Sequence, residues 1–211
     1  LDNGDYCQCK NCTAINNANG SPAGTMISFV NRIAREVKRR GYNNIGIDTF
    51  AYQYTRKPPT QVIPEDNIIV RLCSIECCFS HPLKDDSCEE NVQFMKDLKE
   101  WNRISNRLYI WDYATNYAFT MTFFPNFGVL QDNIKTYYEN GVKGVFVEGN
   151  YYIDDCDTEF GELRAYMISR LLCDPYCDID QVMEEFCTDY YGPGGIYIKQ
   201  FVDAMCEDAT K

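Results

Sequence analysis

The feature of this sequence that most restricts its fold is a fourfold alternation of helix-like and strand-like segments. The helix-like segments carry apolar residues three and four positions apart, and the strand-like segments are short apolar runs. This alternation predicts an α/β fold with a parallel sheet, because parallel strands are joined by helical crossovers. The four predicted strands lie in the ranges 45–52, 68–73, 107–112 and 144–149.

No glycine-rich turn follows any of these strands, which disfavours a nucleotide-binding doubly wound sheet. A (β/α)₈ barrel needs eight strands and typically about 250 residues. The chain has four predicted strands, 211 residues and no initiator Met. We therefore predict the C-terminal half of a (β/α)₈ TIM barrel, strands 5–8, over residues 1–158. We also expect the barrel to need an N-terminal half that precedes this chain.

The pattern becomes all-helical from about Glu159 onward. Apolar residues at helical spacing recur there between turn signals, including a capping box formed by Asp178 and Gln181. We predict a C-terminal helical extension over residues 159–211 that packs on the barrel.

The composition limits the chemistry that this chain can perform. Its net charge of −11 argues against binding of nucleic acids or anionic membranes, and no apolar stretch approaches the length of a membrane-spanning helix. With His81 as the only histidine, acid–base catalysis would depend mainly on carboxylates. We expect no cofactor.

Twelve cysteines are many for a chain of this length and favour a secreted, extracellular protein with disulfides. Cys7, Cys9 and Cys12 are spaced more closely than most disulfide frameworks require. They are weak candidates for zinc ligands, with a fourth ligand from Cys73, Cys77, Cys78 or His81. Structural disulfides or buried thiols are the simpler interpretation.

Carboxylates and aromatic residues follow the predicted strands, at the end where barrels carry their functional groups. The residues concerned are Tyr52, Tyr54 and Arg56 after the first strand, Glu76 after the second, Trp111, Asp112 and Tyr113 at the third, Glu148 and Tyr151 at the fourth, and Asp2 near the start. Paired carboxylates across a rim are the catalytic groups of glycoside hydrolases, and aromatic rings bind the apolar faces of sugars. Each carboxylate can also be a solvated strand end or an ion-pair partner.

An ordered set of motifs spans nearly the whole chain. They are Cys7-Gln8-Cys9-x-x-Cys12, Ala51-Tyr52-Gln53-Tyr54-Thr55-x-x-Pro58-Pro59, Arg71-Leu72-Cys73-Ser74-Ile75-Glu76-Cys77, Trp111-Asp112-Tyr113-x-Thr115-Asn116, Pro125-Asn126, Gly141-Val142-Lys143-Gly144-Val145-Phe146 and Asp189-Tyr190-Tyr191-Gly192. Together they resemble the domain of unknown function 4838 family. That family looks like glycoside hydrolases related to α-glucuronidases and β-N-acetylhexosaminidases.

The resemblance implies a glycosidase barrel that degrades a complex or acidic polysaccharide. Asp2, Glu76 and Asp112 match the catalytic carboxylates of such barrels, with Asp2 as the acid. The expected substrate contacts are Tyr52, Tyr54, Arg56, Trp111, Tyr113, Asn116, Glu148 and Tyr151. Two alternatives remain open: a carbohydrate-binding domain without turnover, and a zinc-stabilised interaction domain built on Cys7, Cys9 and Cys12.

Overall fold

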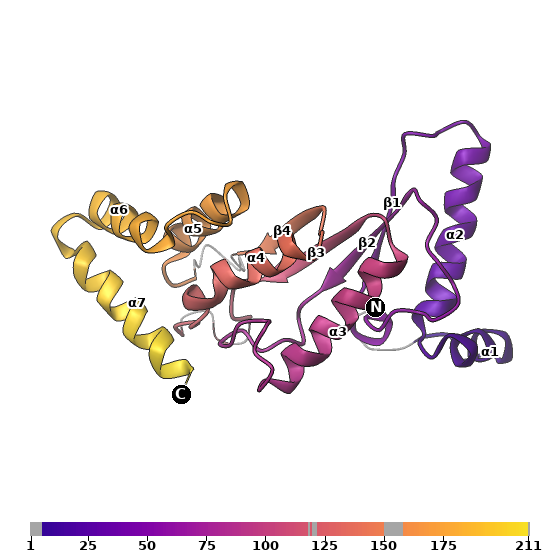
Figure 1. Cartoon of the computed structure of the whole chain (residues 1–211), viewed down its shortest axis with the longest axis horizontal. Coiled ribbons are helices and arrows are strands. Elements are labelled where there is room, and N and C mark those ends of the chain that lie inside the picture. Colours follow the sequence, from indigo (N-terminus) through magenta and orange to yellow (C-terminus); the bar gives the residue numbers. More distant parts are fainter. Residues whose placement is uncertain (1–5, 118, 120–121, 150–157, 211) are drawn as a thin grey trace. The chain divides into compact units, whose positions relative to one another are not determined.

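A computed structural model describes residues 6–117, 119, 122–149 and 158–210 of the chain (Figure 1). The helices are α1 (Lys10–Asn19), α2 (Ala23–Arg39), α3 (Glu89–Ile104), α4 (Leu130–Glu139), α5 (Gly161–Cys173), α6 (Ile179–Tyr191) and α7 (Gly195–Ala209). The strands are β1 (Ile47–Ala51), β2 (Ile68–Cys73), β3 (Leu108–Tyr113) and β4 (Gly144–Glu148). None of the helices in these ranges has the length and apolar character that crossing a membrane requires.

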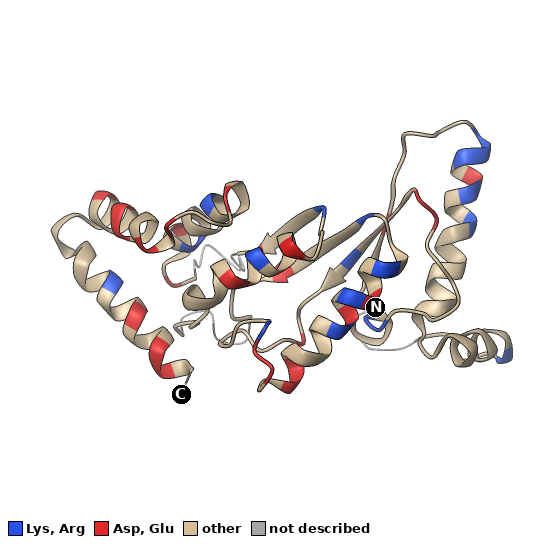
Figure 2. Ribbon diagram, viewed as in Figure 1, with Lys and Arg blue, Asp and Glu red and all other residues tan. Residues whose placement is uncertain are grey.

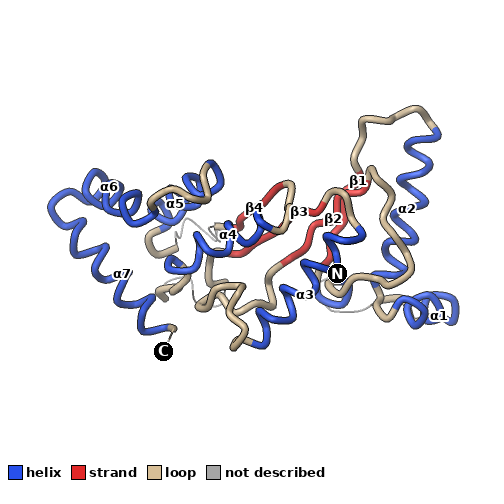
Figure 3. The backbone as a smooth tube through the Cα atoms, viewed as in Figure 1, coloured by secondary structure: helices blue, strands red, loops and turns tan. Residues whose placement is uncertain are grey.

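The four strands form one sheet in the order β1-β2-β3-β4 (Figure 3). Helix α3 lies between β2 and β3 along the chain and α4 between β3 and β4, whereas β1 and β2 are joined by residues 52–67, whose only helical part is the short 3-10 turn Gln53–Thr55. The pairing of β1 with β2 and of β2 with β3 is parallel, with Thr49 opposite Val70 and Leu72 opposite Ile110. The predicted α/β fold, a sheet of sequential parallel strands alternating with helices, is therefore confirmed.

The chain forms two compact units. The first contains Leu1–Glu76, Gln93–Trp111 and Asn140–Val145, and the second contains Cys77–Val92, Asp112–Glu139 and Phe146–Lys211. The predicted helical extension, 159–211, contains α5, α6 and α7 of the second unit. The predicted boundary at 158/159 stays a prediction.

The core of the first unit lies between α2, α3 and one face of the strands. Its fully or nearly buried apolar residues are Ile27, Val30 and Ala34 on α2, Ile68, Val70 and Leu72 on β2, Phe94, Leu98 and Trp101 on α3, and Leu108 and Ile110 on β3. The helical members recur at the three- and four-residue spacing of an apolar stripe, and the strand members at every second position. The apolar faces of the helices and of the strands therefore pack together in one core.

The opposite face of the strands is not covered to the same degree. Successive residues alternate between buried and half-buried along β3 and along β2 as far as Leu72, and Phe50 on β1 is 47% exposed. The less buried face carries polar and aromatic side chains such as Arg71 and Trp111, which tolerate contact with water.

The core of the second unit contains a buried arginine. Arg164 on α5 is fully buried, lies 4.5 Å above the Phe127 ring, and donates hydrogen bonds to the carbonyl of Glu159 at 2.9 Å and to Asn126 Oδ1 at 3.3 Å. It also forms an ion pair with the Glu159 carboxylate. Burial lowers the pKa of Arg164, which Glu159 partly offsets. This network joins α5 to the segment before α4.

The cysteines of the described residues are free thiols: Cys7, Cys9, Cys12, Cys73, Cys77, Cys78, Cys88, Cys173, Cys177, Cys187 and Cys206. The disulfides that the sequence predicts are therefore not seen in the part of the chain that the structure describes.

Candidate functional site

The carboxyl end of β1 continues into a tight turn that positions Arg56. Tyr52 directly follows the strand, and its backbone N–H donates to Thr55 Oγ1 at 3.1 Å. Between them Gln53 adopts a left-handed φ of 46°, which is uncommon for a residue other than glycine. Strained backbone of this kind often accompanies functional sites. The turn ends at Arg56, whose carbonyl accepts the Trp101 indole N–H at 2.6 Å.

Arg56 joins two carboxylates of the first unit. Its Nη1 atom lies 2.8 Å from Glu76 Oε2, and its Nε atom donates to Asp97 Oδ2 at 2.9 Å. The Asp97 side chain is 1% exposed, whereas that of Glu76 is 46% exposed. Burial raises the pKa of Asp97, and the Arg56 charge offsets part of this rise. Glu76 is thus an accessible carboxylate, three residues beyond β2, held by an arginine that is itself anchored.

Charged and aromatic side chains alternate on the less buried face of the strands. Arg71 on β2 donates to both oxygens of Asp48, from Nε to Oδ1 and from Nη2 to Oδ2. Its guanidinium lies 5.8 Å from the Tyr109 ring centre and 5.9 Å from that of Trp111. Phe50 meets Trp111 edge to face, with ring centres 5.2 Å apart. The Asp48 carboxylate raises the pKa of Arg71. Flat apolar rings beside fixed charges provide the contacts by which proteins bind sugars.

The other predicted residues have different surroundings. Tyr54 stacks on Tyr6, with ring centres 5.0 Å apart. In the second unit, Tyr113 lies edge to face with Tyr117, and Asn116 Oδ1 accepts the Phe119 N–H at 3.1 Å. The side chains of these tyrosines and of Asn116 therefore already have partners within the chain.

The predicted carboxylates fall in different parts of the chain. Glu76 is the last residue of its segment in the first unit, whereas Asp112, which is 8% exposed, and Glu148 belong to the second unit. Asp2 and Tyr151 lie outside the described residues. Pairing of Glu76 with Asp112 across one site therefore stays a prediction.

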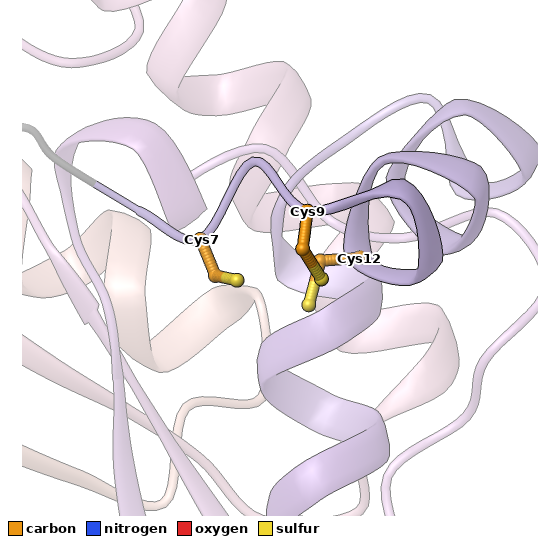
Figure 4. Close-up of side chains that lie close together, drawn as sticks. All are labelled: Cys7, Cys9 and Cys12. Carbon is orange, nitrogen blue, oxygen red and sulfur yellow. The ribbon is translucent and has the colours of Figure 1, made fainter.

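Cys7, Cys9 and Cys12 converge at the start of α1 (Figure 4). Their Sγ atoms lie within 4.8 Å of one another, and Cys7 and Cys9 are exposed. Hydrogen bonds, foremost from the backbone of Cys12, lower the pKa of Cys9 to about 7. The neighbouring Cys7 and Cys9 thiols raise the pKa of Cys12 to about 11. Among the described residues, no fourth Cys, His, Asp or Glu joins this group.

A second group of this kind consists of Cys78, His81 and Cys88, all in the second unit. The sequence pattern predicts Cys78 and His81 only as possible fourth ligands of the first group, and Cys88 only as one of the cysteines that favour disulfides. The structure instead brings these three residues together. The signal that was available is the spacing Cys-x-x-His-x₆-Cys, which combines the sole histidine with two thiols.

Basic residues concentrate along α2 and near its carboxyl end (Figure 2). They line an open groove of about 790 Å³ together with Phe29, Ile33 and Tyr42. Glu36 forms ion pairs with Arg39 and Arg40 in this groove. None of the predicted site residues lines this groove, so it is a weaker candidate site than the strand ends.

Comparison with protein families gives one result. The family model of a domain of unknown function, DUF4838, matches residues 1–203. No curated protein and no solved structure matches the chain.

Proposed function

The chain belongs to the DUF4838 family over nearly its whole length, and from this premise we propose that it is a glycoside hydrolase domain. Its substrate is a complex or acidic polysaccharide. We further propose that β1 to β4 are strands five to eight of a (β/α)₈ barrel whose preceding half completes the active site, and that the protein is secreted. The sequential order of parallel strands supports this barrel assignment.

The observation that carries the proposal is the environment of Glu76. Its carboxylate is half exposed, follows a parallel strand, and lies 2.8 Å from an arginine that is fixed by the buried Asp97. An arginine partner donates charge-assisted hydrogen bonds that orient a carboxylate, which fits a role as base, nucleophile or charge stabiliser. We assign this role to Glu76 and Asp112, and the acid role to Asp2.

The aromatic face of the strands supports a carbohydrate ligand. Trp111 offers a ring beside Phe50 and beneath the Arg71 guanidinium. Arg71 and Arg56 are bound to carboxylates in the structure, so each carries a positive charge that is already oriented. In the proposed complex, the rings contact the sugar and Arg56 contributes to binding of an acidic group. Tyr52, Tyr54, Tyr113, Asn116, Glu148 and Tyr151 are the further proposed contacts.

The convergence of Cys7, Cys9 and Cys12 favours a second candidate function, a zinc-stabilised interaction domain. A structural zinc site has four ligands, and here three thiols supply three of them. Equilibrium dialysis of the reduced chain against Zn²⁺, compared with a Cys7→Ser/Cys9→Ser variant, tests this candidate. Loss of one equivalent of zinc in the variant supports it, and unchanged stoichiometry refutes it.

Activity of the full-length protein against aryl glycosides and glucuronidated oligosaccharides tests the hydrolase proposal. We expect Glu76→Gln and Asp112→Asn each to reduce kcat on the order of 10²–10⁴-fold. The matched control is Glu89→Gln, which alters an exposed carboxylate at the start of α3. Full activity in both variants would refute the assignment. Sugar binding without turnover in the unmodified protein would point to a binding domain instead.

A further inference from the structure

The loop between β2 and α3 gathers two thiols and the only histidine of the chain. Cys78 Sγ lies 3.1 Å from His81 Nδ1. Cys88 Sγ completes a group whose three ligand atoms all lie within 4.8 Å of one another. Three side chains with sulfur or imidazole ligands thus meet in one place.

A buried amide fixes the backbone of this loop. Asn91, which is fully buried in the first turns of α3, accepts the Cys78 N–H at 3.0 Å and donates to the carbonyls of His81 at 3.1 Å and Pro82 at 3.2 Å. The Leu83 N–H is held in turn by Asn133 Oδ1 at 2.9 Å. Cys78 and His81 are therefore held beside the helix start at which Cys88 lies, before any ligand binds.

The surroundings of Cys88 favour a cation. Cys88 directly precedes α3, and its carbonyl accepts the Val92 N–H at 2.9 Å, so its side chain lies at the start of this helix. Glu90 Oε2 lies 3.4 Å from Cys88 Sγ. The carboxylates of Asp85 and Glu90 also act electrostatically on His81. The group therefore offers a cation two thiols and an imidazole as ligands, with negatively charged carboxylates nearby.

We propose that Cys78, His81 and Cys88 bind one Zn²⁺ ion, with the Glu90 carboxylate or a water molecule as the fourth ligand. Tetrahedral zinc with bonds of about 2.3 Å to sulfur and about 2.0 Å to nitrogen separates its ligand atoms by roughly 3.3–3.8 Å. The Cys78 Sγ–His81 Nδ1 distance of 3.1 Å lies just below this range, and no two of the three ligand atoms are more than 4.8 Å apart, so small side-chain rotations form the site. Thiolate and imidazole ligands select zinc over magnesium or calcium. Each thiol that enters the site releases its proton to solvent.

The test uses the whole chain, reduced and stripped of metal with a chelator. This chain carries Cys7→Ser, Cys9→Ser and Cys12→Ser, so that the first thiol group does not bind metal. We expect one equivalent of Zn²⁺ to bind, and Co²⁺ in its place to give thiolate charge-transfer bands and tetrahedral d–d bands. Cys88→Ser should weaken binding at least ~100-fold, because even loss of an outer-shell partner costs 10–100-fold. Cys173→Ser, which removes an exposed thiol, should leave binding unchanged.

The single histidine, His81, allows zinc binding to be detected by NMR without substitution of any proposed ligand. Its ring signals in the NMR spectrum are unambiguous, and they should shift to new positions with one equivalent of Zn²⁺. His81→Asn should abolish the cobalt bands while the circular dichroism spectrum stays unchanged. An unshifted His81 ring at saturating Zn²⁺ would overturn the proposal. So would a Cys78–Cys88 disulfide in the protein as isolated, found by mass mapping.

Discussion

The Nε atom of Arg56 lies 2.9 Å from Oδ2 of Asp97, so a loop residue after β1 is bound to a carboxylate on the buried side of α3. Asp97 also accepts a hydrogen bond from Gln93, one turn earlier on the same helix, at 3.0 Å. A carboxylate that is 1% exposed is costly unless it is paired and hydrogen-bonded. The position of Arg56, and through it the position of Glu76, therefore depends on a residue far from the strand ends in sequence.

We expect Asp97→Asn to destabilise the protein by about 2 kcal/mol, because it exchanges a charge-assisted hydrogen bond for a neutral one next to a partly buried guanidinium. Denaturation by urea, followed by tryptophan fluorescence, measures the change in the free energy of unfolding. Asp86→Asn, which alters an exposed loop carboxylate, is the control and should change stability little. Equal effects of the two substitutions would mean that the Arg56–Asp97 pair contributes no particular stability.

Arg164→Leu should destabilise the second unit by roughly 3–5 kcal/mol, because it leaves the Glu159 carboxylate with its charge unpaired in the interior. Arg170→Leu on the exposed side of the same helix should cost far less. Thermal unfolding by circular dichroism compares the two variants. The double variant Arg164→Leu/Glu159→Leu should recover part of the loss, and no recovery would argue against the ion pair as the cause.

Gly195→Ala should destabilise the α6–α7 hairpin by about 3 kcal/mol, because a Cβ atom there would collide with the Cys187 carbonyl and separate the two helices. Gly194→Ala is the adjacent control, since a Cβ at that position meets no atom within 4 Å. Melting temperatures of the two variants measure the difference. Two equal melting temperatures would show that α7 adapts its position without cost.

Lys84 and Glu139 provide a pH-dependent contact, with Nζ and Oε2 2.6 Å apart. The Lys84 ammonium holds the pKa of Glu139 below its ordinary value. A carboxyl whose pKa is lowered by folding contributes stability above its unfolded pKa, and that contribution disappears as the pH falls through its folded pKa.

Lys84→Met should therefore lower the urea midpoint at neutral pH, and the difference from the unmodified protein should disappear in acid. Lys96→Met, an exposed residue of α3, should show no such pH dependence. A Lys84→Met difference that is constant with pH would assign the effect to packing of the side chain.

Most of the fold could be predicted from local patterns. The bounds of β2 agree with the apolar run that predicted this strand. At the start of α6, Asp178 accepts the Gln181 N–H at 3.0 Å, so it caps the helix as the sequence indicated. Helix α1 could not be predicted, because its sequence has no apolar stripe. It is held by buried asparagines, and Asn19 Oδ1 accepts the N–H groups of Gln61 and Val62, which are remote in sequence.

Residues of the candidate site could be predicted only where a charged side chain closely follows a predicted strand. Glu76 and Arg56 could be named in this way, but their anchor Asp97 could not, because its contacts depend on how α3 packs. One signal was present: Asp97 lies three residues after Phe94 and one before Leu98, within the apolar stripe of the helix. A carboxylate at such a position indicates a buried partner. The grouping of Cys88 with Cys78 and His81 likewise depends on the path of a loop.

The side chain of Asn91 couples the unfolding of the loop after β2 to that of the first turns of α3. It bonds to Cys78, His81 and Pro82 at once, so none of these backbone groups is released unless the asparagine leaves its buried position. Loop and helix start therefore open to solvent together, as one cooperative event. In hydrogen exchange, the amide of Cys78 should report the frequency of that opening, although it belongs to an irregular loop.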